Sequence, residues 1–179
     1  LAYGDYFQGG VKVAGADVDG TGAEEVITGA GPGGGPHVRV FDHGGSERTG
    51  WLAYPSGFAG GVRVAGGDLD GDGRDEVITA PGFGGGPHVR VFDGTNGNEY
   101  RGLLAYASRF TGGASVASGD VNGDGRDEII TAAGYGGGPH VRIFDTFGTE
   151  MGGFLAYDPG FAFGVTVAAG DVDGDGRDE

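Results

Sequence analysis

The sequence has 179 residues but no cysteine, a single tryptophan and only 11 lysine and arginine residues. Without cysteine, the chain can form neither disulfide bridges nor metal sites built on thiolates. The basic residues form no cluster, and binding to nucleic acid requires such a patch. No apolar run approaches the ~18 residues of a membrane-spanning helix. We therefore expect neither a nucleic-acid partner nor a membrane span.

Glycine and acidic residues are, by contrast, abundant. The 45 glycines make up about a quarter of the chain, against a usual ~7 %, and the formal net charge is −15. Of the 26 acidic residues, 18 lie in four short stretches. These stretches are residues 17–25, 68–76, 120–128 and 171–179. Carboxylates packed this closely repel one another, so we expect a cation to bind among them.

The acidic stretches belong to an internal repeat. Their first aspartates are separated by 51, 52 and 51 residues. Each unit contains four short apolar segments, and no sustained 3.6-residue period predicts a helix. In the second unit the segments are residues 61–65, 77–80, 88–92 and 102–106. Four strands in about 50 residues are typical of a propeller blade. The sequence therefore predicts an all-β fold of tandem four-stranded antiparallel blades, a β-propeller-like array.

The repeat divides this single array, residues 1–179, into three whole units and two partial ones. The boundaries are a partial unit 1–6, units 7–57, 58–109 and 110–160, and a partial unit 161–179. Residues 1–3 are expected to be the fourth strand of one unit, and residue 179 the last loop residue of another. Unpaired strand edges invite pairing with another chain. We therefore expect a segment of a longer propeller, or a protomer completed by its neighbours in an oligomer or filament.

The acidic stretches have the spacing of a calcium loop. In the second, oxygen-bearing side chains stand at positions one, three and five (Asp68, Asp70, Asp72), glycine at six permits a sharp turn, and Glu76 closes the loop at nine. The backbone carbonyl of position seven can supply a further oxygen. Calcium takes six to eight oxygen ligands in a flexible shell, whereas magnesium demands tighter octahedral geometry and zinc would need histidine or cysteine. The pattern therefore predicts bound Ca²⁺.

The candidate ligands come from positions one, three, five, seven and nine of each loop. They are Asp17, Asp19, Thr21, Ala23 and Glu25; Asp68, Asp70, Asp72, Arg74 and Glu76; Asp120, Asn122, Asp124, Arg126 and Glu128; and Asp171, Asp173, Asp175, Arg177 and Glu179. Thr21 replaces a fifth-position aspartate, so the first loop is expected to bind most weakly. Position eight (Asp75, Asp127, Asp178) offers an alternative ligand to the glutamates, and Asp-Gly pairs also make simple hairpin turns without any metal.

Two segments carry a family resemblance. Residues 161–176, FAFGVTVAAGDVDGDG, and residues 77–82, VITAPG, resemble the FG-GAP repeat of integrin α-subunit propellers and related bacterial repeat proteins. The resemblance implies a calcium-dependent β-propeller, commonly secreted or on a cell surface, that serves in adhesion or as a scaffold. The sequence departs from that pattern in having Phe-x-Gly-Gly in three units and in its repeated Gly-Gly-Gly-Pro-His-Val segment. The ligand specificity of the family is therefore not carried over.

Other recurring residues suggest mainly structural roles. The tyrosines Tyr3, Tyr54, Tyr106 and Tyr157 suit an amphipathic outer strand or, alternatively, a sugar-binding aromatic face. The arginines Arg39, Arg90 and Arg142 are expected to pair with acidic residues between blades.

The sequence favours a binding or structural protein over an enzyme. A catalytic site must break the repeat symmetry, and the units are nearly interchangeable. We expect an extracellular calcium-stabilised scaffold for adhesion, with other protein chains, copies of itself or glycans as partners. The alternatives are a propeller-type lyase or hydrolase, and a dockerin-like binding module. Dockerin loops lead into helices, whereas Ile129-Ile130-Thr131 is typical of a strand.

Overall fold

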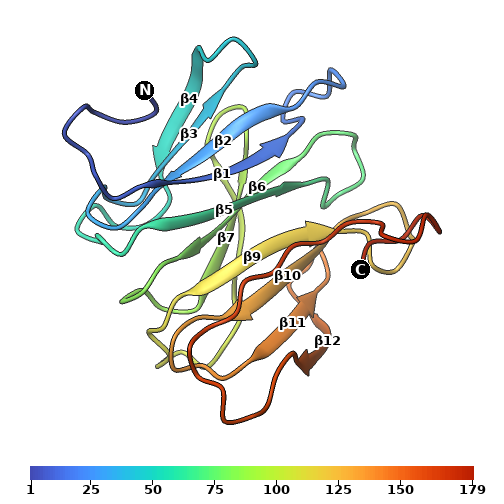
Figure 1. Ribbon diagram of the computed structural model, residues 1–179. Helices are drawn as coiled ribbons and strands as arrows, with labels where there is room; N and C mark the ends of the chain where they lie inside the picture. The colour runs from blue at the N-terminus through green and yellow to red at the C-terminus, as the bar shows by residue number, and fades with distance from the viewer.

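The computed structural model describes residues 1–179 and contains only β-strands, turns and loops. Twelve strands form three four-stranded antiparallel sheets, each built from consecutive strands (Figure 1). The first sheet contains β1 (Val11–Ala16), β2 (Glu25–Ala30), β3 (His37–Phe41) and β4 (Glu47–Leu52). The second contains β5 (Val62–Gly67), β6 (Glu76–Pro81), β7 (His88–Asp93) and β8 (Glu99–Leu104). The third contains β9 (Ala114–Gly119), β10 (Glu128–Ala133), β11 (His140–Phe144) and β12 (Glu150–Leu155). The predicted fold class is confirmed.

The sheets pack face to face in a row, with β5 lying between β1 and β9 (Figure 1). Burial falls from the inner strands outward: all six residues of β6 are buried, whereas β8 is mostly exposed. Ile78 of the second sheet shares a core with Val116 and Ile129 of the third. Because the second sheet has a neighbouring sheet on each face, its inner strands β5 and β6 carry buried apolar residues on both sides. No helix is present that is long and apolar enough to cross a membrane.

The strand boundaries in the second unit differ from those expected by one to three residues, and the differences at the first and fourth strands have a clear cause. The first strand begins at Val62 instead of Gly61, whose φ of +84° lies outside the β region. The fourth strand covers Glu99–Leu104 instead of residues 102–106. Beyond Leu104 the Ala105 N–H still bonds to the carbonyl of Pro87 beside β7, and the chain then leaves the sheet as Tyr106 turns towards the third blade. The apolar segment 102–106 therefore extends two residues beyond the end of β8.

The partial units also differ from expectation. Residues 1–3 form no strand, and neither do residues 161–179. Val165 and Val167 nevertheless pack against the core of the third sheet, which includes Ile130. A strand is defined by its pairing, and these segments have no partner strand beside them. The three sheets themselves lie within the ranges 7–57, 58–109 and 110–160.

The blades are joined by a repeated contact that uses the recurring tyrosines. The Tyr54 hydroxyl, which follows β4, donates to the carbonyl of His88 in the next sheet at 2.8 Å and lies 3.2 Å from the Thr79 hydroxyl. Tyr3 and Tyr106 make the same contacts one blade before and one blade after. Tyr54 is only 8 % exposed, so it is neither an outer-strand residue nor part of a sugar-binding face.

The recurring arginines reinforce the same contact. Arg142 donates a hydrogen bond to the carbonyl of Ala105 in the preceding unit at 2.9 Å and forms an ion pair with Glu150 of its own sheet at 3.3 Å. Arg39 and Arg90 are bonded in the same way. The expected pairing with acids between blades was therefore wrong. The acidic partner belongs to the same blade, and the contact between blades goes to a backbone carbonyl.

Candidate metal centre

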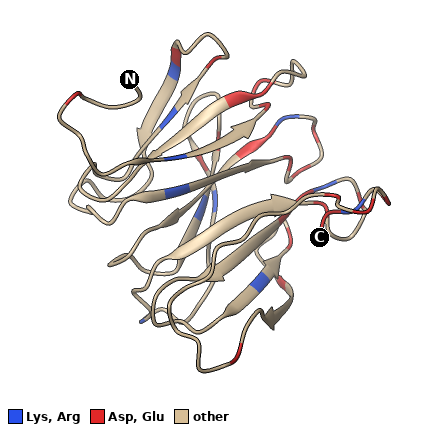
Figure 2. Cartoon of the chain, in the orientation of Figure 1, with Lys and Arg blue, Asp and Glu red and all other residues tan.

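The first three acidic stretches form tight loops between the first two strands of each sheet, and the fourth, residues 171–179, follows the last sheet (Figure 2). In the second loop, the Asp68 carboxylate accepts the N–H groups of Gly71 at 2.7 Å and Gly73 at 2.9 Å. Both glycines have positive φ, +78° and +84°, which side chains rarely tolerate. These bonds curl the loop around the side chain of its first residue. The turn that the glycine spacing indicated is therefore present.

The curl brings three carboxylates of the loop together. Oxygens of Asp68, Asp70 and Glu76 all lie within 4.8 Å of one another. Equivalent groups form in the first loop (Asp17, Asp19 and Glu25) and in the last (Asp171, Asp173 and Glu179). Oxygens bound to one calcium ion at ~2.3–2.6 Å are separated by at most about 5 Å. The three groups therefore have the spacing and the hard oxygen donors that calcium requires.

The third loop, residues 120–128, has the same curl, but its position three is an asparagine instead of an aspartate. Asp120 accepts the N–H groups of Gly123 and Gly125, as Asp68 does in the second loop. Asn122 donates its amide nitrogen to Glu128 at 2.7 Å and to Asp124 at 3.2 Å. Turning this amide over would direct its oxygen, a calcium ligand, towards the same centre. This loop therefore has two carboxylates and an amide where the second loop has three carboxylates.

The remaining candidate positions are used differently. Position five lies outside the grouped carboxylates: Asp72 accepts the N–H of Arg74 at 2.9 Å. Position eight faces the preceding blade, because Asp75 accepts the N–H of Asp17 at 2.8 Å and donates its own N–H to the carbonyl of Asp17 at 2.9 Å. Asp178 makes the same pair of bonds to Asp120. The position-eight aspartates therefore connect consecutive loops.

Burial makes the metal-free loops electrostatically unfavourable. Glu76 is buried, and desolvation together with the neighbouring Asp70 and Asp68 raises its pKa to about 7. Its carboxylate accepts one hydrogen bond, from the N–H of Leu69 at 3.1 Å. Desolvation and the flanking Asp75 and Asp178 likewise raise the pKa of Asp127 to about 7. A divalent cation would offset the repulsion that disfavours ionised Glu76.

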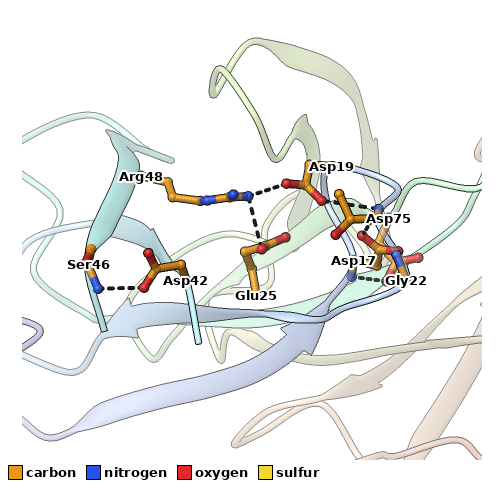
Figure 3. Close-up of polar contacts among 9 residues, drawn as sticks. Asp17, Asp19, Gly22, Glu25, Asp42, Ser46, Arg48 and Asp75 are labelled. Atoms are coloured by element: carbon orange, nitrogen blue, oxygen red, sulfur yellow. Dashed lines mark hydrogen bonds and ion pairs between the residues drawn. The ribbon is translucent and has the colours of Figure 1, made fainter. Parts of the chain in front are cut away.

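The first loop already contains a cation from the protein itself. Arg48 on β4 places one guanidinium nitrogen 2.5 Å from Asp19 and 3.0 Å from Glu25 (Figure 3). The bond from Arg48 lowers the pKa of Asp19. Burial raises the pKa of Glu25, although Arg48 acts in the opposite direction. The acidic pair at positions three and nine is thus bridged without a metal.

The side chain at this place differs in every blade. Arg48, Tyr100 and Met151 each follow the glutamate that begins β4, β8 or β12, at an irregularity in the pairing with the preceding strand. Such bulges redirect a side chain. Tyr100 points its hydroxyl at Asp70, 3.3 Å away. Sequence reasoning missed these residues. Aligning the units on Glu47, Glu99 and Glu150 would have marked them as a variable position, but only the sheet shows that it faces the loop.

The comparisons with known proteins agree with the loop geometry and the fold. The model of the FG-GAP-like repeat family matches residues 68–131, from the second acidic loop into β10. This segment is an FG-GAP-like repeat. The match confirms the predicted resemblance, and it includes the grouped carboxylates Asp68, Asp70 and Glu76. No curated protein matches the chain in sequence.

Several solved structures share the fold of this chain. An exotype rhamnogalacturonan lyase, YesX, superposes with a TM-score of 0.66 and 18 % identity, covering 94 % of this chain and 37 % of that one. A rhamnogalacturonan lyase of Bacillus licheniformis has a TM-score of 0.62 and 19 % identity, covering 94 % and 38 %. A protein of unknown function from Bacteroides caccae has a TM-score of 0.52 and 11 % identity, covering 90 % and 49 %.

These likenesses concern the fold alone. The chain spans less than half the length of these solved structures. The loops lead into strands β2, β6 and β10, which is the arrangement of propeller blades and not of a dockerin, whose loops lead into helices.

Proposed function

We propose that the chain is a calcium-stabilised extracellular scaffold that presents its surface to other proteins, to copies of itself or to glycans in adhesion. The observation that carries the proposal is the convergence of Asp68, Asp70 and Glu76 around one point without an ion pair to any basic side chain. Extracellular calcium sites typically have dissociation constants of ~10⁻⁴–10⁻³ M. Exposed loops of this kind would therefore be filled outside the cell.

The loop position explains how an ion would stabilise the scaffold. The first three loops each join the first two strands of a sheet, and the eighth-position residues Asp75 and Asp178 bond to the loop of the preceding blade. Bound calcium would hold Asp68 and Asp70 against Glu76 at the start of β6. An ion that binds only the folded state stabilises it by mass action. Calcium in this role fixes both the blade and its contact with the next one.

The absence of catalysis is part of the proposal. The residues that recur in each blade are occupied by contacts between blades, as with Tyr54 and Arg90, or by the acidic loops. At one break in the repeat, the Arg48 position, the guanidinium is engaged by two carboxylates. An enzyme would need an unengaged acid, base or nucleophile that differs between blades. The structure therefore supports a binding role better than a reaction.

Thermal unfolding tests the calcium role directly. The midpoint of the metal-free protein is compared with that in about 5 mM calcium, above the ~10⁻⁴–10⁻³ M dissociation constants of extracellular sites. Each site should contribute about 1.4 kcal/mol when free calcium is ten times its dissociation constant. Magnesium at the same concentration is the control and should raise the midpoint less, since it dehydrates reluctantly.

The same comparison of unfolding midpoints with a double variant shows whether calcium acts at the second loop. Asp68→Asn together with Glu76→Gln keeps the size of both side chains but removes their charges. The calcium-dependent part of the midpoint shift should fall by the contribution of one site. If calcium does not raise the unfolding midpoint of the unmodified protein, the proposed function is overturned.

The composition of the loops also predicts their order of filling. The Asp68 loop, with carboxylates at positions one, three and five, should fill before the Asp120 loop, where Asn122 replaces a carboxylate. The Asp17 loop should bind most weakly, because Thr21 replaces the fifth-position aspartate and Arg48 holds the third. Anomalous diffraction at limiting calcium measures the order. Early filling of the Asp17 loop would contradict it.

A further inference from the structure

We propose that Arg48 is the permanent cation of the first loop, so that this loop folds without calcium and excludes it. The inference rests on the proposed function, because it assigns one acidic loop to a calcium-independent state and leaves the others to bind the ion. It makes the first blade the part of the scaffold that stays folded when calcium is scarce.

The first argument is steric. The nitrogen of Arg48 lies 2.5 Å from a carboxylate oxygen of Asp19 and 3.0 Å from one of Glu25. A calcium ion would need to approach oxygens of the same two side chains to ~2.3–2.6 Å. The nitrogen and the ion cannot both occupy the space between these carboxylates. Figure 3 shows the guanidinium extending from β4 to this point.

The second argument concerns charge. The grouped carboxylates of the first loop are Asp17, Asp19 and Glu25, and one guanidinium reduces their formal charge from −3 to −2. The corresponding carboxylates of the second loop, Asp68, Asp70 and Glu76, form no ion pair with an arginine and keep a formal charge of −3. The grouped carboxylates of the first loop therefore offer calcium less negative charge than those of the second. The arginine, being positive, also repels an incoming cation.

The third argument is that the loop is already held together. Asp17 accepts the N–H groups of Thr21 at 3.0 Å and Gly22 at 2.6 Å, which gives the same curl as in the second loop. Glu25 is only 5 % exposed, and one of its oxygens has no hydrogen-bond partner. A buried carboxylate in this state requires a nearby positive charge. Arg48 supplies that charge, so the loop does not depend on an ion.

The other blades act as natural comparisons. At the place of Arg48, the second blade has Tyr100, which is neutral and offers a hydroxyl oxygen next to Asp70. The third blade has Met151, which has no charge. Neither side chain competes with a cation. The chemistry of this single bulge residue thus separates a loop with an internal cation from loops that need an external one.

The experiment counts calcium ions bound to the full chain, by native mass spectrometry together with calorimetric titration. The unmodified protein should bind one ion fewer than its four acidic stretches. Arg48→Met, which copies the third blade, should gain one ion. Tyr100→Arg, which copies the first blade, should lose one. Arg109→Met removes an exposed arginine that has no ion pair and should leave the count unchanged.

The outcomes separate the two proposals. An unmodified protein that fills all four stretches, or a folded Arg48→Met protein with an unchanged count, would overturn the role of Arg48 while the calcium function stands. If no variant binds calcium, the proposed function fails and this inference fails with it. Should Arg48→Met not fold even in calcium, Tyr100→Arg decides, since retention of the ion beside the new arginine would overturn the inference.

Discussion

The contacts between blades and the acidic loops repeat with the same period but differ in how strictly they are kept. The hydroxyls of Tyr3, Tyr54 and Tyr106 lie 2.9, 2.8 and 2.8 Å from the carbonyls that they contact. The loops instead vary, with Thr21 in one and Asn122 in another. The tyrosine contacts are largely buried, where losing one partner leaves polar groups unsatisfied. The loops face solvent, where one ligand or cation can replace another.

The contrast assigns a separate role to each region. The tyrosine contacts order the blades relative to one another and require no ion. The loops adjust the stability of each blade to its surroundings, through calcium or through Arg48. Changes at the tyrosines should therefore be large and insensitive to calcium. Changes at the loops should be smaller and depend on calcium or pH.

The largest expected effect is that of Tyr54→Ala. Truncating a large buried side chain typically costs about 3–5 kcal/mol, and here the change also removes a hydrogen bond to His88. We expect the same loss in calcium and in chelator, measured by denaturant unfolding. A loss that appears only without calcium would mean that the two regions are not separate.

Tyr157→Ala is the matched control. Tyr157 holds the same place in the repeat but is 60 % exposed and forms no hydrogen bond through its hydroxyl. Its truncation should cost less than about 1 kcal/mol, as is usual for surface substitutions. An equal cost for Tyr54 and Tyr157 would show that the buried contact does not hold the blades together.

A smaller effect is expected from pH in the metal-free protein. The pKa values of Glu76 and Asp127 rise from ordinary values of 4.5 and 3.8 to about 7 in the folded chain. Between the ordinary pKa values and about pH 7, the folded state binds more protons than the unfolded state. The free energy of unfolding therefore falls as pH rises through this range. The midpoint of thermal unfolding without calcium should therefore be lower at about pH 8 than at about pH 5.

Calcium should counteract this trend, because it binds the ionised form of Glu76. The increase in midpoint that calcium gives should accordingly be greater at the higher pH. Asp127→Asn tests the part of the pH dependence that calcium does not remove, since Asp127 lies outside the grouped carboxylates. The variant should weaken the pH dependence with and without calcium. An unchanged profile would mean that Asp127 is not the group that titrates.

The smallest effect is expected at the link between loops. Asp75→Ala removes the acceptor for the N–H of Asp17 and should cost about 1 kcal/mol, part of which is offset by reduced repulsion. Asp75→Asn keeps an acceptor, removes a charge, and should be neutral or stabilising in chelator. Calorimetric titration then distinguishes position eight from position nine. Weaker calcium binding in Asp75→Asn than in Glu76→Gln would make position eight the ligand.

Features that depend on nearby residues could be predicted from the sequence. The grouping of Asp68, Asp70 and Glu76 follows from a nine-residue spacing and from glycines that permit positive φ. The end of the fourth strand could not be placed, because Ala105 and Tyr106 are apolar or aromatic like the strand before them. The chain turns away there because the Tyr106 hydroxyl bonds to the carbonyl of His140 in the third blade.

The sequence by itself determined the repeat, the four-stranded blades and the acidic loops, because periodicity, strand patterning and glycine turns all act over short distances. Only the tertiary structure decided which positions face one another. Arg48 is 29 residues from Asp19 and 23 from Glu25, and Tyr54 is 34 residues from His88. A folded sheet brings Arg48 to its loop across three strand pairings, and the packing of one sheet on the next brings Tyr54 to its partner. No local pattern encodes contacts that form between separate strands.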